Sequence, residues 1–212
     1  MNTKTQSHKI PFILLAIYTI LFITLAIDPY SRAVWWAESI PVLIVVGILL
    51  LTYSNFKFSN LSYFLMVVFL CYHTIGGYFT FALVPFDWGN NALSQLGFDF
   101  ILPEGRNNFD RLGHFLVGVF AYPAVEISLR KQWVSNALMA WVFGVFALGF
   151  WAASYEIIEM AYAVVEGGES GVAFLGSQGD VWDAQKDMLM DILGSCVFGL
   201  LALFTQRHWR NQ

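Results

Sequence analysis

Long apolar stretches alternate with short polar segments along the chain. Six stretches contain no Asp, Glu, Lys or Arg: residues 11–27, 39–56, 58–86, 112–125, 132–155 and 192–206. A helix rises about 1.5 Å per residue, so it needs about 20 residues to cross the roughly 30 Å hydrocarbon core of a bilayer. This pattern predicts an all-α membrane bundle of six transmembrane helices.

The expected helices fill almost the whole chain and leave no room for a separate soluble domain. The first stretch is interpreted as a membrane helix and not as a signal peptide, because no small-x-small cleavage site follows it. We therefore expect one integral membrane domain over residues 1–212, with helices at about 11–27, 36–54, 61–83, 109–129, 133–160 and 184–206.

The positive charges indicate an orientation. If the N-terminus is cytoplasmic, the inner segments hold seven Lys and Arg residues (Lys4, Lys9, Lys57, Arg130, Lys131, Arg207, Arg210), and the outer side holds four (Arg32, Arg106, Arg111, Lys186). Cytoplasmic loops carry the excess of Lys and Arg, so both termini are predicted to be cytoplasmic. The long connections, roughly 84–108 and 164–182, are then on the outer side.

Composition supports this class of protein and excludes others. Hydrophobic residues make up 58% and charged residues 12% of the 212 residues. A soluble domain carries about 25% charged residues. The net charge is −4, so the chain lacks the basic surface that nucleic-acid binding requires. The expected partners are membrane lipids, and the oligomeric state is left open.

Two of the apolar stretches are too short to span a membrane without acidic residues. Residues 192–206 reach about 22 Å as a helix, so this helix must extend back through Asp191 and Asp187. Residues 112–125 reach about 21 Å and must take in Asp110, Glu126 or both. Helix length alone therefore places carboxylates in or at the membrane.

Their spacing places several polar side chains on shared helix faces. Asp183, Asp187 and Asp191 follow one side of the sixth helix, and Asp110 and His114 are one turn apart on the fourth. With the predicted topology, these side chains lie in the outer half of the bilayer. So do Glu156 and Glu159 of the fifth helix, His73 of the third and Glu38 at the start of the second.

So many carboxylates in a low-dielectric setting need compensation. A divalent metal, shared protons, or ion pairs with Arg111 and Lys186 would each provide it. Simpler roles are also open for some residues: Asp180 or Asp183 as a helix cap, Glu38 as a first-turn acid, and His73 as a core histidine. Glu126 and Arg130, four residues apart, are expected to form a structural pair.

Four segments resemble the YjdF family. They are Trp-Ala-Glu-Ser-Ile-Pro at 36–41, Phe-Asp-Arg-Leu-Gly-His at 109–114, Tyr-Glu-Ile-Ile-Glu at 155–159, and Gly-Ser-Gln-Gly-Asp-Val-Trp-Asp-Ala-Gln-Lys-Asp-Met at 176–188. The resemblance implies a multi-pass protein of the bacterial inner membrane. The family has no assigned activity, so the resemblance adds nothing to mechanism.

The leading hypothesis is a metal-dependent membrane hydrolase or transferase that acts on a lipid or lipid-linked substrate from the periplasmic side. Histidine with carboxylates suits Zn²⁺, Mn²⁺ or Mg²⁺. The hypothesis assigns three sets of residues: metal ligands (His73, His114, Glu156, Asp187), catalytic or ligand-orienting carboxylates (Asp191, Glu159, Asp183), and supporting residues (Asp110, Asp180, Lys186, Arg111, Glu38).

Other functions fit the same residues, so whether the protein is an enzyme stays open. The acids and histidines could bind an ion or relay protons in a transport protein. Against this, the chain lacks the internal repeat typical of transporters. The residues could also form a structural polar network without catalysis, or an acidic outer face that recruits a partner.

Overall fold

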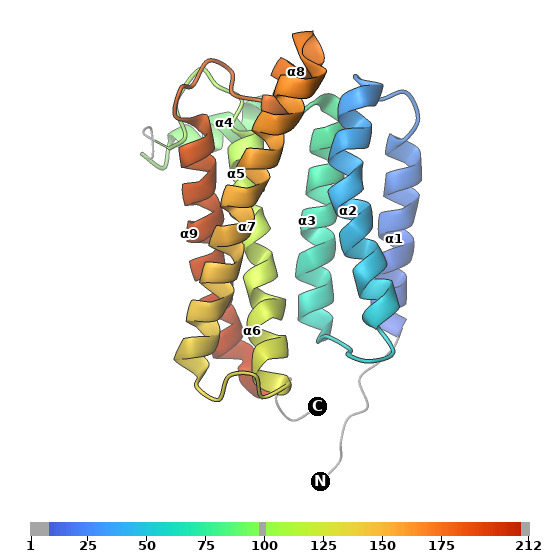
Figure 1. Ribbon diagram of the computed structural model, residues 1–212, viewed down its shortest axis with the longest axis vertical. Helices are drawn as coiled ribbons and strands as arrows, with labels where there is room; N and C mark the ends of the chain where they lie inside the picture. The colour runs from blue at the N-terminus through green and yellow to red at the C-terminus, as the bar shows by residue number, and fades with distance from the viewer. Residues whose placement is uncertain (1–8, 98–100, 209–212) are drawn as a thin grey trace.

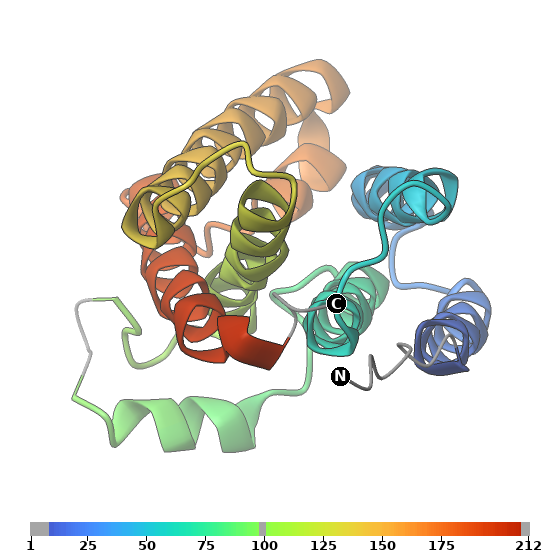
Figure 2. The same ribbon diagram turned by 90° about the horizontal axis from the view of Figure 1, so that it is seen from below.

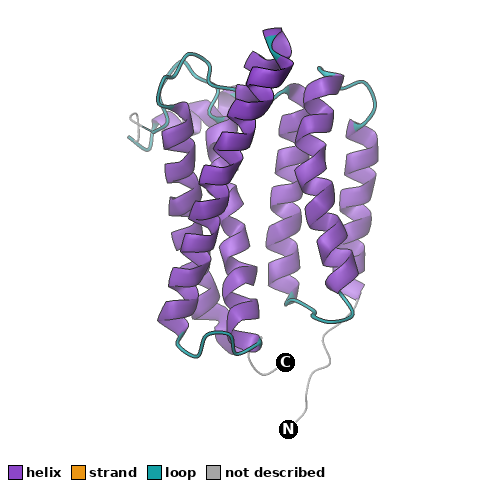
Figure 3. Cartoon of the chain, in the orientation of Figure 1, coloured by secondary structure: helices purple, strands orange, loops and turns teal. Residues whose placement is uncertain are grey.

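In the computed structural model, which describes residues 9–97 and 101–208, all regular structure is helical (Figure 3). The elements are α1 Lys9–Leu25, α2 Arg32–Thr52, α3 Asn60–Phe79, α4 Asp87–Ser94, α5 Phe109–Val117, the 3₁₀ turn η1 Gly118–Phe120, α6 Ala121–Arg130, α7 Ala137–Glu166, α8 Gly168–Leu175, α9 Asp183–Thr205 and η2 Gln206–His208. The expected all-α fold is confirmed for this part of the chain.

Five helical segments in the described ranges are long and apolar enough to cross a membrane. They are α2, α3, the continuous segment Phe109–Arg130 formed by α5, η1 and α6, then α7 and α9. α1 is apolar but has 17 residues, about 26 Å at the helical rise, which is short of the roughly 30 Å core. The structure thus establishes five candidate spans of the six expected.

The two long connections contain helices that the hydrophobic pattern did not predict. α4 occupies part of the 84–108 connection and α8 part of the 164–182 connection. α7 continues to Glu166, beyond the expected end near residue 160. It stops at Gly167, which has φ +65°, a conformation that glycine adopts without the steric cost of a Cβ. These short elements lie outside the apolar stretches, so their pattern did not indicate helix.

The helices form two groups that lie side by side (Figures 1 and 2). α1 and α2 pack on α3, while α7, α5 and α6 pack around α9. α3 joins the groups through its contacts with α5 and η1. The start of α1 and the end of α9 lie at the same end of the bundle (Figure 1). Two of the charges counted for the orientation, Lys4 and Arg210, lie outside the described residues.

A glycine pair brings α9 close to the continuous helical segment Phe109–Arg130. A Cβ at Gly118 would collide with the backbone of Gly194 and Ser195, and a Cβ at Gly194 would collide with the carbonyl of Phe115. Small residues allow such backbone approach between membrane helices. Because α5 lies against α9, the acids of α9 reach the polar residues of α5 directly.

At the opposite end of the bundle, Glu126 makes the expected pair with Arg130, whose Nη1 lies 2.6 Å from Oε1. The carboxylate also accepts hydrogen bonds from the backbone N–H of Ser59 at 2.7 Å and from the hydroxyls of Ser59 and Ser62. Glu126 therefore links the start of α3 to α6, and it lies at the other end of the bundle from His114.

Candidate functional site

A cavity of about 690 Å³ lies between the two helix groups. Its walls come mainly from α2 and α7, with further residues from α3, α5 and η1. A volume of this size is typical of sites for small molecules. Most lining residues are apolar, for example Ile44, Ile48, Val117, Phe120 and Leu148.

The polar lining is confined to one end of the bundle, the end at which α9 begins. It comprises Glu38, Tyr72, His73, Asp110, His114, Tyr155, Glu159, Tyr162 and Asp191. Toward the other end of the bundle, α2, α5 and α7 contribute apolar side chains only. The cavity is thus amphiphilic along the direction of the helices.

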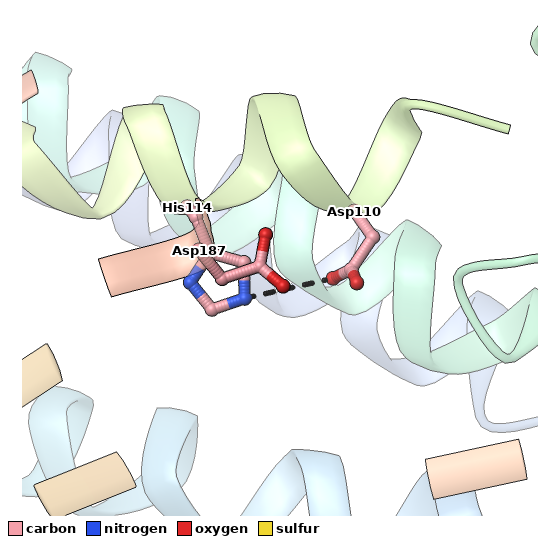
Figure 4. Close-up of side chains that lie close together, drawn as sticks. All are labelled: Asp110, His114 and Asp187. Carbon is pink, nitrogen blue, oxygen red and sulfur yellow. Dashed lines mark ion pairs between the residues drawn. The ribbon is translucent and has the colours of Figure 1, made fainter. Parts of the chain in front are cut away.

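Three polar side chains meet at the end of the bundle where α9 begins. Asp110 and His114, one turn apart on α5, and Asp187 of α9 each place a potential ligand atom within 4.8 Å of the others. Figure 4 shows the Asp187 carboxylate extending toward that of Asp110 beside the imidazole ring. His114 Nε2 lies 3.8 Å from Oδ1 of Asp110. With small side-chain adjustments, this group offers one nitrogen and two carboxylates to a cation.

A fourth residue holds the other side of the His114 ring. Nδ1 of His114 lies 3.2 Å from Oδ2 of Asp191, and Asp191 is buried. If Nδ1 carries the proton and donates to Asp191, Nε2 presents its lone pair to Asp110 and Asp187. Carboxylates orient metal-binding histidines in this way.

Ion pairs supply much of the compensation that the acids of α9 require. Arg111 is fully buried; its Nη2 lies 2.5 Å from Oδ1 of Asp183, and its Nε lies 2.6 Å from Oδ1 of Asp187. Arg106 also binds Asp183. The arginines bind Oδ1 of Asp183 and Oδ1 of Asp187. Oδ2 of Asp187 therefore remains for contacts with Asp110 and His114.

Asp180 lies just before α9, where Lys186 Nζ donates to its Oδ2 at 2.9 Å. This hydrogen bond, with a further one from the backbone N–H of Trp182, lowers the pKa of Asp180 to about 2. Asp180 and Lys186 therefore form an ion pair at the start of α9, next to the arginines. Arg111 Nη2 lies 3.5 Å from Oδ2 of Asp180.

His73 and Glu38 form a separate pair on the α2–α3 side of the cavity. Nε2 of His73 lies 3.2 Å from Oε2 of Glu38, and the hydroxyl of Tyr155 donates to the same oxygen at 3.1 Å. The bond from Tyr155 links α7 to α2. The structure thus places His73 in the same cavity as His114 but in contact with a different carboxylate.

Glu156 and Glu159 of α7 differ in their surroundings. Glu156 interacts electrostatically with His114 and Asp187, and its Oε1 is buried without a hydrogen-bond partner. Glu159 lines the cavity, is 9% exposed and makes no hydrogen bond with any described residue. Both acids lie close to the cluster, as their spacing predicted.

Arg106 and Tyr155 contact acids of the candidate site, although neither was assigned to the site from sequence. Arg106 binds Asp183 and lies 3.7 Å from Asp110, four residues further along the chain. Tyr155 binds Glu38. Arg106 precedes α5, so the helical i, i+4 rule gave no signal for it, whereas Tyr155 begins the family-like segment Tyr-Glu-Ile-Ile-Glu.

Comparison with known proteins gives a family. The model of the family described as "Predicted membrane protein (DUF2238)" matches residues 10–208. The chain is 35% identical over 179 residues to "Inner membrane protein YjdF" of Escherichia coli (strain K12), covering 84% of this chain and 81% of that protein. No solved structure matches. The chain therefore belongs to the DUF2238 family, and its resemblance to the YjdF family is confirmed. The inner-membrane relative and the apolar helices support a bacterial inner membrane location.

Proposed function

We propose that this member of the DUF2238 family is a metal-dependent hydrolase or transferase that acts on a lipid or lipid-linked substrate. The observation that carries the proposal is the position of His114. One ring nitrogen faces the buried Asp191, and the other lies on the side of Asp110 and Asp187. This arrangement lies at the polar end of an otherwise apolar cavity.

The proposed ligands are Asp110, His114 and Asp187. One histidine and two carboxylates suit Zn²⁺, Mn²⁺ or Mg²⁺. Asp191 takes the orienting role toward His114. His73 contacts Glu38, so we assign it to the opposite wall and not to the metal.

A metal held by Asp110, His114 and Asp187 would supply Lewis-acid chemistry, namely activation of a water nucleophile and polarisation of the substrate oxygen. Glu156 is the carboxylate suited to accept the proton of that water, because Oε1 lacks a hydrogen-bond partner and the residue interacts with His114 and Asp187. Asp183, bound by two arginines, is assigned to positioning α9 and not to proton transfer.

Metal analysis of the purified full chain tests the proposal. We expect about one divalent ion per chain in the parent, loss of that ion in His114→Ala, and its retention in His73→Ala. The two variants remove the same side chain from the same cavity, so they are matched. A parent without metal, or equal metal in both variants, would reject the metalloenzyme. The arginine pairs would then favour a structural polar network.

The topology belongs to the same proposal. We propose that α1 completes a sixth crossing through local bilayer thinning, by which short helices are accommodated, with both termini cytoplasmic and the site on the periplasmic side. The lysine and arginine distribution supports this orientation. A reporter that is active only in the cytoplasm should be active when fused after Gln212. A reporter that is active only in the periplasm should be active when inserted within the 164–182 connection.

A further inference from the structure

The cavity opens sideways onto the apolar surface of the bundle. Five of its lining residues are also strongly exposed: Ile40, Ile44 and Ile48 of α2, and Trp151 and Ile158 of α7. A side chain that both lines a cavity and lies on the outer surface marks the rim of an opening. α2 and α7 therefore flank an entrance that faces the hydrocarbon of a bilayer, and an apolar chain can enter from there without crossing water.

The polar end of the cavity has a strong charge bias. Four carboxylic residues line it, namely Glu38, Asp110, Glu159 and Asp191. Among the described residues that line it, none is Lys or Arg. The arginines of the cluster are instead held by the acids of α9. The two histidines that line it, His73 and His114, each pair with one of these acids, so a cationic ligand group would be attracted to the remaining carboxylates.

Glu159 identifies where a cationic group would bind. It is nine-tenths buried, faces the cavity and makes no hydrogen bond with a described residue. By contrast, Glu38 is bound by His73 and Tyr155, Asp191 by His114, and Asp110 lies near Arg106 and His114. A buried carboxylate without a partner is costly unless a ligand or proton compensates it.

We infer that the substrate is a lipid whose head group carries an ammonium, with that ammonium on Glu159 and one hydrocarbon chain between α2 and α7. The inference rests on the lipid substrate of the proposed function and names its class. A primary ammonium donates up to three hydrogen bonds, so it satisfies a carboxylate that no protein group reaches. The apolar side chains that line the cavity, including Ile44 and Phe120, would contact the hydrocarbon chain of the lipid.

Lipid binding by the detergent-solubilised full chain tests the inference, measured by native mass spectrometry with phosphatidylethanolamine, its N-acetylated form and phosphatidylglycerol. Phosphatidylethanolamine should bind at least about tenfold more tightly than the other two, because a hydrogen bond to a charged group contributes about 1.5–3 kcal/mol. Equal binding of phosphatidylethanolamine and its N-acetylated form would overturn the inference.

Variants locate the binding. Glu159→Gln should weaken phosphatidylethanolamine binding at least about tenfold, whereas Glu166→Gln, an exposed acid two turns along the same helix, should not change it. Ala147→Trp, which fills the cavity, should abolish binding of every lipid. Unchanged binding in Glu159→Gln would reject the assignment. If Glu159→Gln fails to fold, the comparison of lipids on the parent decides.

A chelator arm separates the two proposals. In one outcome, the purified parent contains no metal and still prefers phosphatidylethanolamine, with or without chelator. In that case the ammonium site stands and the metal-dependent reaction fails. If metal is present and lost in His114→Ala but no lipid preference is seen, the metal site stands and the ammonium site fails.

Discussion

Nδ1 of His114 lies 3.2 Å from Oδ2 of Asp191, although 77 residues separate the two along the chain. The contact joins α5 to α9 at the depth where the carboxylates of Asp110, Glu156 and Asp187 also lie. When Nδ1 carries the proton, the contact leaves Nε2 free, and so it links the packing of two membrane helices to the chemistry of the cavity.

Replacing Asp191 by Asn tests this link. The amide keeps the size of the side chain but removes the charge that orients and polarises His114. Loss of such an orienting partner lowers metal affinity about 10- to 100-fold. Competition with a chelator of known affinity measures the effect, and Asp87→Asn, an exposed acid on α4, is the control. An Asp191→Asn variant with parental affinity would contradict the orienting role.

Arg111 should be essential for folding because it is fully buried and binds two acids of α9. Arg111→Gln leaves Asp183 and Asp187 with less positive charge, and breaking a buried ion pair costs about 3–5 kcal/mol. Chemical unfolding in mixed micelles measures the free energy. The exposed Arg207→Gln should change it by less than about 0.5 kcal/mol. Similar losses in both variants would show that the pairs contribute little.

The close contact of α5 and α9 predicts a steep cost for one added methyl group. Gly194→Ala and Gly118→Ala each place a Cβ against backbone atoms, which cannot move aside as a side-chain end can. We expect losses of about 4 kcal/mol or more and loss of metal. Gly47→Ala in α2 has open space around its Cβ and should gain up to about 1 kcal/mol of helix propensity. Thermal unfolding of the three variants checks the contrast.

Acid stability should depend on Asp180. Its pKa is lowered to about 2 from the ordinary value of 3.8, so the folded state binds the proton more weakly than the unfolded state. The stability contributed by its pair with Lys186 is therefore complete above about pH 4 and is lost as the pH falls toward 2. Asp180→Asn should be less stable than the parent at pH 6, and the difference should shrink below pH 4. A difference that is constant from pH 6 to pH 2 would contradict the ion pair.

The spans are largely a property of the sequence. Helix length across a bilayer depends on how many consecutive apolar residues occur, which is a one-dimensional quantity. The same holds for the shared face of Asp183, Asp187 and Asp191, because a four-residue spacing returns to the same side of a helix. Both rules are local, so the amino-acid sequence alone was enough to predict the five long apolar helices and the common face of these acids, but not the short helices α4 and α8.

The partners of those acids depended on the tertiary structure. All the acids of α9 share a face, yet Asp183 binds two arginines, Asp187 lies between Arg111 and His114, and Asp191 holds His114. Which residue each one meets depends on the rotation and depth of α5 against α9, and the contact of Gly118 with Gly194 sets both. His73, equally plausible from sequence, faces Glu38 because α3 packs beside α2. Spacing along one helix carries no information about the rotation of its neighbour, so only the packed bundle could separate the residues at the proposed metal site from those on the opposite wall.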